Sequence, residues 1–243
     1  MVHKLAIVAI IGLSASAVCM GAAAAIGGSE FGKGLDGMEL GLFSDRPRCE
    51  HGGGYPISRT LDWDGSDHAG IAIPGRVTYA PGNDDKVHIS GNPVLVPHIR
   101  VRDGRVELDC RMFHDSTNDL AVTLPGREFK RFSIAGSGNL DLQNLNQERV
   151  KLSIAGSGNI KAQGKVEHIE SHIAGSGDID ASHVESRIAE VHIAGSGNTD
   201  IAPTEEADIH IAGSGDVNLH TNPRKLETHI AGSGRIHNIA AGG

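Results

Sequence analysis

Hydrophobic and polar residues recur at a nearly constant spacing in the C-terminal half of the chain, around the pentapeptide Ile-Ala-Gly-Ser-Gly. Successive copies start 18 to 20 residues apart, at Ile134, Ile154, Ile173, Ile193, Ile211 and Ile230. A period of this length is too short for a pair of helices and fits one coil of a solenoid. We therefore expect each copy to form one coil that stacks on the next.

Apolar residues alternate with polar ones around each motif, as expected for a strand with one buried face. Two columns of residues share the face of the motif isoleucine. Two residues before the isoleucine stand Phe132, Leu152, Ser171, Val191, Ile209 and Thr228. Six residues after it stand Leu140, Ile160, Ile179, Thr199, Val217 and Ile236. A third apolar group, four or five residues before the motif, comprises Phe129, Val150, Ile169, Ile188, Ala207 and Leu226. These columns predict a narrow core, and the same parity places both motif glycines on its inner side.

The predicted fold is all-β, a right-handed single-stranded parallel β-helix with coils of about 19 residues. The handedness rests on the strong right-handed preference of parallel crossover connections. Coils stacked about 4.8 Å apart would align equivalent residues into ladders, and no coil would be stable without its neighbours. Only 3% of the residues are aromatic while 33 are glycine, which suits thin layers of Ile, Val, Leu and Ala.

The first part of the chain is predicted to direct export. Residues 1–25 resemble a signal peptide, with a basic start at His3 and Lys4, an apolar stretch from residue 5 to 18, and small residues at 22–25. Gly and Ser interrupt the apolar stretch, whereas a membrane span would need about 20 apolar residues. We therefore expect no membrane span after cleavage. An alternative is a lipoprotein signal with Cys19 as the lipidated residue.

Three further segments follow the predicted signal peptide. Residues 26–56, rich in Gly and charge, are predicted to be a flexible lead-in. Residues 57–132 are strand-like but lack the motif, and they are predicted to form an N-terminal cap with degenerate coils, in which His88-Ile-Ser-Gly-Asn echoes the later repeats. Residues 133–243 are the six-repeat solenoid, and 57–243 are expected to form one continuous domain.

Two cysteines, Cys49 and Cys110, remain after the predicted cleavage. Exported compartments are oxidising, so the pair is a candidate disulfide. Two separately buried thiols are the alternative, because the sequence does not place the two Cα atoms within bonding range.

The charge of the chain excludes one class of partner. The formal net charge is -8, and Lys and Arg are not clustered. Nucleic-acid binding depends on grouped cations that displace counterions, so no nucleic-acid partner is expected.

Several segments together resemble a known family. They are the repeated IAGSG followed by Asn or Asp, LPGREFKRFSIAGSGN at 124–139, LDWDGSDHAGIAIPGRVTYAPG at 61–82 and IRVRDGRVELD at 99–109. Over roughly residues 60–235 the chain is similar to the family called putative auto-transporter adhesin head GIN domain. The resemblance implies a β-solenoid exported to the bacterial envelope, and it brings no established activity, catalytic residue or cofactor.

A column of histidines stands one residue before the motif isoleucine, at His172, His192, His210 and His229, with Ser133 and Ser153 in the first two coils. Rings about 4.8 Å apart in a stack could converge in pairs on zinc or copper. A third ligand would be needed, and Glu170 and Glu190 are candidates. The alternative is an exposed polar ladder of stacked rings.

Two further columns are candidates for binding. The motif serines, predicted on the outside of the bend, are Ser137, Ser157, Ser176, Ser196, Ser214 and Ser233. The column after the motif is Asn139, Asn159, Asp178, Asn198 and Asp216, ending in Arg235. The period does not match calcium-binding nonapeptide solenoids, so a corner ladder of hydrogen bonds is the structural interpretation of this column.

Catalysis has little support in the sequence. Gly-Ser-Gly lacks the spacing of a nucleophile elbow, and six copies do not suit a single nucleophile. Outer residues such as Asp141, Lys161, Asp180 and Asp200 are the remaining candidates for a polysaccharide-cleaving enzyme. The leading hypothesis is a non-enzymatic exported module, in the periplasm, on the outer envelope or secreted. It would bind a cell-surface glycan or an envelope protein on its polar ladders and self-associate through the C-terminal solenoid edge.

Overall fold

The structure is a computed structural model that describes residues 49, 54–64, 67–111 and 119–240. All of them belong to one compact unit, residues 45–243. The predicted signal peptide and most of the predicted lead-in lie outside the described residues. No helix in the described ranges is long and apolar enough to cross a membrane.

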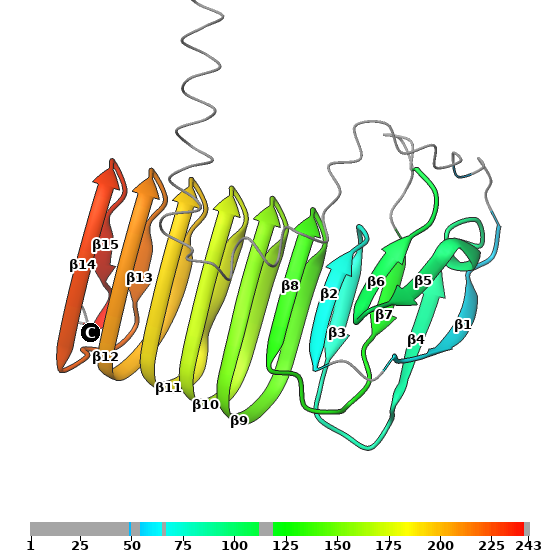
Figure 1. Cartoon of the computed structure of the whole chain (residues 1–243), viewed down its shortest axis with the longest axis horizontal. Coiled ribbons are helices and arrows are strands. Elements are labelled where there is room, and N and C mark those ends of the chain that lie inside the picture. Colours follow the sequence, from blue (N-terminus) through cyan, green and yellow to red (C-terminus); the bar gives the residue numbers. More distant parts are fainter. Residues whose placement is uncertain (1–48, 50–53, 65–66, 112–118, 241–243) are drawn as a thin grey trace, which may run out of the picture. The chain divides into compact units, whose positions relative to one another are not determined.

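The six motif copies stack as parallel coils, which confirms the predicted β-solenoid (Figure 1). The coils are made by β8 (Arg131–Gly136), β9 (Asn139–Gly156), β10 (Asn159–Gly175), β11 (Asp178–Gly195), β12 (Thr199–Gly213), β13 (Val217–Leu219), β14 (Lys225–Gly232) and β15 (Ile236–Asn238). Each motif isoleucine is the register partner of the next, from Ile134 and Ile154 to Ile211 and Ile230.

Each long strand contributes to both walls of the solenoid. The first residues of β9 pair with β3 on one wall, and its last residues pair with β8 on the other. A strand with a side-chain period of two keeps its apolar residues inside along both walls. The structure thus builds a dry interior between two parallel sheets that are continuous through the bends.

The predicted inward columns form this interior, with one correction. Ile188 was expected inside, but it is partly exposed and lies in the outer column between His168 and Glu206. Ala189 takes the inner position instead, in register with Ile169 and Ala207. In the 20-residue coil that ends at the motif of Ile193, the inward residue lies four positions before the motif. The expectation that Ile188, with its larger side chain, faces inward was therefore wrong.

The two glycines of each motif play different roles, and the prediction that both face inward was wrong for the first. Gly156 has φ of +132°, and a Cβ there would lie 2.5 Å from the backbone oxygen of Gly136 in the previous coil. Gly158 is buried, and a Cβ there would lie 2.5 Å from the backbone oxygen of Gly138 and 2.7 Å from the Ile134 Cγ2 atom. Both glycines therefore permit the close stacking of coils at the bend, and the second also leaves room for the isoleucine of the neighbouring coil.

The strands before the motif coils close the N-terminal end. They are β1 (Ile57–Asp62), β2 (His68–Ala72), β3 (Arg76–Tyr79), β4 (Lys86–Gly91), β5 (Ile99–Arg102), β6 (Arg105–Leu108) and β7 (Leu120–Thr123), with a short 3-10 turn at Val96–His98. β2 and β3 make a coil that stacks directly on β8 and β9, and β6 and β7 make a further coil outside it.

The order of these coils in space differs from their order in the sequence. The chain passes from β3 outward to β4 and then returns through β6 and β7 before it enters β8. β4 runs antiparallel to β7 and to β1, and β5 runs antiparallel to β6. The His88 segment that echoes the motif is therefore a strand of the cap and not a degenerate coil. Antiparallel strands end the parallel stack here.

An aromatic cluster fills the interior beside the cap. The rings of Tyr79, Phe129 and Phe132 pack together with centroids 5.0 to 5.6 Å apart, and Trp63 lies edge-on to Phe129 at 5.2 Å. The buried Tyr79 hydroxyl donates a hydrogen bond to the carbonyl of Arg127.

Cys49 and Cys110 are joined by a disulfide, with their Cα atoms 5.1 Å apart.

Candidate functional site

The motif serines lie at the bend between the two walls, and all six are exposed. The backbone N–H of each serine from the second coil onward donates to the first glycine of the previous coil, as Ser157 does to Gly136 at 2.9 Å. Within the described part of the chain no hydroxyl of this serine row is hydrogen-bonded. The row therefore presents free donors and acceptors to solvent.

The column of Asn and Asp side chains beside the serine row connects successive coils. The Asn159 amide donates to Oδ1 of Asn139, and the Asn198 amide donates to Oδ1 of Asp178, both at 3.0 Å. Backbone N–H groups donate to the same column, up to Arg235 onto Asp216 at 2.8 Å. Most oxygen acceptors of this column are thus engaged in the fold, which favours a structural role over ligand binding.

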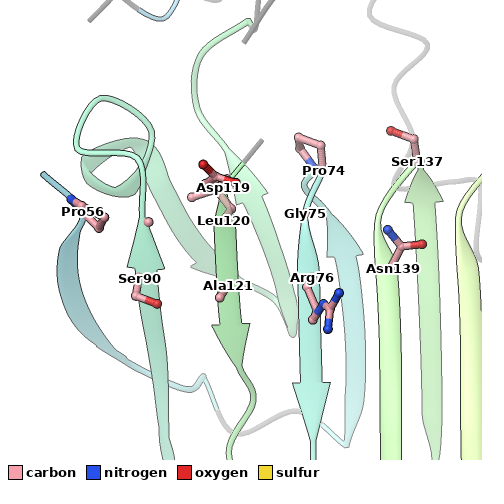
Figure 2. Close-up of a pocket in the computed structure, with 11 residues that line it drawn as sticks. Pro56, Pro74, Gly75, Arg76, Ser90, Asp119, Leu120, Ala121, Ser137 and Asn139 are labelled. Carbon is pink, nitrogen blue, oxygen red and sulfur yellow. The ribbon is translucent and has the colours of Figure 1, made fainter. Parts of the chain in front are cut away.

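An open hollow of about 560 Å³ lies where the cap meets the first motif coil (Figure 2). Its polar lining comes from β3, β4, the start of β7 and the first motif, namely Arg76, Ser90, Asp119, Ser137 and Asn139. Pro56, Pro74 and Leu120 supply apolar surface. The hollow is therefore formed by the cap together with the first members of both predicted binding columns.

The polar groups of the hollow are free to bind a ligand. Among the described residues, neither the Arg76 guanidinium nor the Asp119 carboxylate has an ion-pair partner, and both side chains are exposed. Asn139 accepts a hydrogen bond through Oδ1, so its amide N–H groups remain free. One cation, one anion and several neutral donors and acceptors thus face the same space.

The histidines form a stacked column on the opposite wall from β3. Their ring centroids are 4.7 to 5.0 Å apart from His172 to His229. The exposure rises along the column from His172 to His229, and His172, predicted to be exposed, is 5% exposed. The rings therefore pack on each other, as the ladder alternative predicted.

A carboxylate stands two residues before each of three histidines, on the same face of the strand. The Nε2 atom lies 2.5 Å from Glu170 for His172, 2.7 Å from Glu190 for His192 and 3.1 Å from Asp208 for His210. The structure thus brings Glu170 and Glu190 to the histidines, as a metal site would require. Each Nε2 is, however, directed at one carboxylate, so the ligand atoms form separate pairs.

Glu170 is the most strongly perturbed carboxyl of this wall. Its hydrogen bond with His172, and then that with Lys151 at 2.7 Å, lower its pKa to about 2 in spite of partial burial. The pKa of His168 is lowered by burial and then by the positive charge of Arg149. The histidine wall is thus a network of histidine–carboxylate and lysine–carboxylate contacts that connects successive coils.

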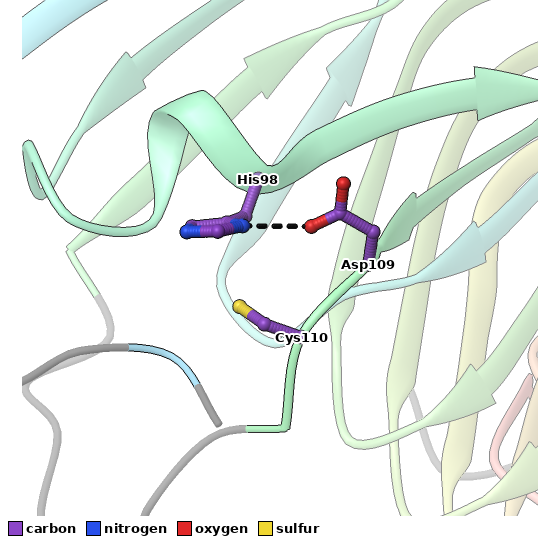
Figure 3. A group of neighbouring side chains, drawn as sticks. All are labelled: His98, Asp109 and Cys110. Carbon is purple, nitrogen blue, oxygen red and sulfur yellow. Dashed lines mark hydrogen bonds and ion pairs between the residues drawn. The ribbon is translucent and has the colours of Figure 1, made fainter. Parts of the chain in front are cut away.

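One group of described residues does bring three possible metal ligands together, namely His98, Asp109 and Cys110 (Figure 3). Nδ1 of His98 lies 2.7 Å from Asp109, which also pairs with Arg100 at 2.7 Å. The Cys110 sulfur belongs to the disulfide with Cys49 and is not available as a thiolate. This cluster supports the cap and does not form a metal site.

The outer residues that suggested an enzyme are engaged with their neighbours. Asp180 accepts hydrogen bonds from Ser182 and lies 3.8 Å from Lys161, and Asp200 accepts from Asn218 at 3.1 Å. They lie on an open wall in successive coils. Asp141 heads the same column.

The sequence did not single out the cap residues of the hollow. Arg76 is the register partner of Asn139, and Gly75 accepts from the Asn139 N–H as Gly138 does from Asn159. The segment Pro74-Gly75-Arg76 is thus the equivalent of Ser-Gly-Asn in a motif coil. An alignment of these two short segments is the signal that could have identified Arg76.

One solved structure shares this fold, and two others have lower similarity. A crystal structure from Bacteroides fragilis described as a putative adhesin has 19% sequence identity and a TM-score of 0.59, covering 76% of this chain and 97% of that one. A structure from Parabacteroides distasonis described as a putative lipid binding protein has 18% identity and a TM-score of 0.48, covering 77% and 98%. A putative adhesin from Parabacteroides merdae has 17% identity and a TM-score of 0.46, covering 77% and 98%.

Among curated protein sequences, none matches this chain. The model of one protein family does match it, over residues 71–223, which include the lining of the hollow except Pro56, five of the six motifs and most of the histidine column. The chain therefore belongs to the family described as "Putative auto-transporter adhesin, head GIN domain".

Proposed function

We propose that this protein is a non-enzymatic, adhesin-like module that binds a glycan in the hollow between Arg76 and Ser137. The observation that carries the proposal is the set of unengaged polar side chains that line this space. Its volume of about 560 Å³ lies within the range of small-ligand sites. Membership in an adhesin family fits a protein that is exported or held at the cell surface.

The lining matches the chemistry of a sugar. Sugar hydroxyls both donate and accept hydrogen bonds, and the hollow offers the Asp119 carboxylate as acceptor, the Arg76 guanidinium and Asn139 amide as donors, and serine hydroxyls as both. Pro56 and Pro74 offer apolar surface for the ring face of a sugar.

A glycan fits these features better than a protein partner does. Protein interfaces rely on large aromatic and apolar anchors at their centre. The hollow is instead small and polar, and the serine row continues from Ser137 along five further coils. A longer polysaccharide could therefore extend from the hollow along the bend.

The hollow lacks the arrangement that hydrolysis of a glycan requires. Glycosidases place two carboxyl groups on either side of the scissile bond, one as acid and one as base or nucleophile. Among the residues that line the hollow, Asp119 is the one carboxylate. This supports binding without cleavage.

A glycan array tests the proposal directly. We expect the wild-type protein to bind a subset of bacterial or host glycans, and Arg76→Ala and Asp119→Ala each to weaken that binding at least about tenfold, which corresponds to losing one charged hydrogen bond. Arg127→Ala is the matched control, because Arg127 is also exposed but lies outside the hollow. Equal loss in the control, or no glycan bound by the wild type, would overturn the proposal.

A further inference from the structure

The last described coil leaves an open sheet edge. Leu226 and Ile230 of β14 occupy inward positions of the solenoid, yet they are 47% and 44% exposed. Ile239, in the same coil beyond β15, is 48% exposed. The reason is that no described strand stacks on this coil, whereas each earlier isoleucine is covered by the next coil.

No described strand pairs with the backbone of β14 on this side. Successive residues of a strand direct their N–H and C=O groups to alternate sides, so β14 pairs with β12 through one set and leaves the other set without a partner among the described residues. The edge carries eight consecutive strand residues, Lys225–Gly232, all of them exposed. It therefore offers both hydrogen-bonding groups and apolar side chains to a further strand.

The opposite end of the solenoid matches this edge less well. There the antiparallel strands β1, β4 and β5 end the parallel stack, as Figure 1 shows at the end away from β14. The outermost strands at that end, β1 and β5, have six and four residues, fewer than the eight of β14. The best-matched edge on a second copy is therefore its own β14.

We infer that two copies of this chain associate tail to tail through antiparallel pairing of their β14 strands around a two-fold axis. Such an interface is self-complementary, since the same patch is used on both copies. In the register centred on Thr228, Leu226 of one copy lies opposite Ile230 of the other. In the same register Glu227 lies opposite His229, so a carboxylate acceptor faces an imidazole that can donate to it on both sides of the axis.

The local charges allow this register. Lys225 already pairs with Glu206 at 2.6 Å and with Glu227 at 2.8 Å in its own chain, so it retains a partner when Glu227 turns toward the second copy. Opposite Lys225 the register places Ala231, which carries no charge. The edge thus contains no like-charge contact in the pairing that matches the apolar residues.

The association has a consequence for binding. The hollow is lined in part by residues of β3, β4 and β7. These strands lie at the other end of the solenoid from β14 (Figure 1). A tail-to-tail dimer would therefore place two identical hollows at its two far ends. Two sites on one rigid rod can engage two points of a surface, which raises the effective affinity without new contacts at either site.

Sedimentation velocity of the full chain over a wide concentration range tests this inference. We expect a reversible monomer–dimer equilibrium, and Ile230→Lys should raise the dissociation constant at least about tenfold because it places a charge in the pairing edge. Ile57→Lys is the matched control, since Ile57 is 39% exposed at the capped end. It should leave the equilibrium unchanged.

The register is tested by exchanging charges. Glu227→Lys should weaken the dimer by removing the carboxylate that faces His229 of the second copy, and the double variant Glu227→Lys with His229→Glu should restore it through a lysine–glutamate pair. Circular dichroism confirms that each variant folds.

A strict monomer at every concentration, as when another segment of the same chain covers the edge, would overturn the inference. A dimer unaffected by Ile230→Lys or weakened by Ile57→Lys would do the same. Because the readout is mass, the result is independent of glycan binding in the hollow.

Discussion

The imidazole ring of His192 stacks on that of His210, with the ring centroids 5.0 Å apart and the planes inclined by 12°. The two residues are register partners in adjacent coils, so the stack is a direct consequence of the repeat. Each ring is held at its Nε2 side by a carboxylate two residues earlier. The wall thus combines ring stacking with histidine–carboxylate contacts, and the lowered pKa of Glu170 should make its stability depend on pH.

Glu170 is expected to make the fold sensitive to acid. Its folded-state pKa of about 2 lies below the ordinary value of 4.5, because its carboxylate pairs with His172 and Lys151. Stability from this group is complete above pH 4.5 and is lost as the pH falls from there toward 2. We expect the unfolding free energy of the wild type to fall in this window by about 2 kcal/mol more than that of Glu170→Gln.

Denaturant unfolding at a series of pH values measures this difference. Glu167→Gln is a suitable control, because Glu167 is an exposed carboxylate that pairs with Arg187 across coils. The control should keep the pH dependence of the wild type. Parallel pH profiles for the wild type and Glu170→Gln would contradict the assignment.

Thr199 offers a test of the core. Its hydroxyl is buried without a hydrogen-bond partner among the described residues, in the column of Ile179 and Val217. Replacing it by the isosteric Val removes a buried unsatisfied group, so Thr199→Val should stabilise the fold by about 1 kcal/mol. The exposed Thr204, whose hydroxyl donates to the carbonyl of Ser186, serves for comparison, and Thr204→Val should not stabilise. Thermal unfolding distinguishes the two.

Alanine substitutions at two glycines distinguish the cost of backbone strain from the cost of a clash between stacked coils. Gly136 and Gly156 both have positive φ, but a Cβ meets no atom within 4 Å at Gly136 and a backbone oxygen at 2.5 Å at Gly156. Gly136→Ala should cost about 1 kcal/mol for the backbone conformation, and Gly156→Ala about 3 kcal/mol or more. Equal losses in chemical denaturation would show that the coils can move apart at the bend.

The disulfide should stabilise the cap. Cys49 and Cys110 are separated by 61 positions, and closing a loop of this length contributes about 4 kcal/mol in the chain-entropy model. The double variant Cys49→Ser with Cys110→Ser should therefore expose the cap to limited proteolysis while β9 to β12 stay protected. Cleavage that begins in the motif coils instead would show that the cap does not depend on this bond.

The sequence predicts the motif coils well because their physics is local and repeated. Each coil has the same period and the same parity, so one register accounts for Ile134 through Ile230. Ile188 was misplaced because the length of the corner before it differs from coil to coil. The exposure of His172 was also misjudged, since it depends on packing beyond its own coil.

The cap could not be derived in the same way. Its strands pair out of sequence order, with β3 lying between β7 and β9, and no periodicity records such a path. The hollow depends on this path, because it brings Asp119 and Arg76 beside Ser137. The serine row could be predicted from the repeat. The cap side chains that make Ser137, its first member, part of a site could not.

The most direct test of the account is a crystal structure of the protein with an oligosaccharide selected on the glycan array. We predict sugar density in the hollow, with hydrogen bonds to the Arg76 guanidinium and the Asp119 carboxylate and with Ser137 at its edge. Density confined to the histidine wall, or to the outer wall of Asp180 and Asp200, would contradict the proposed site.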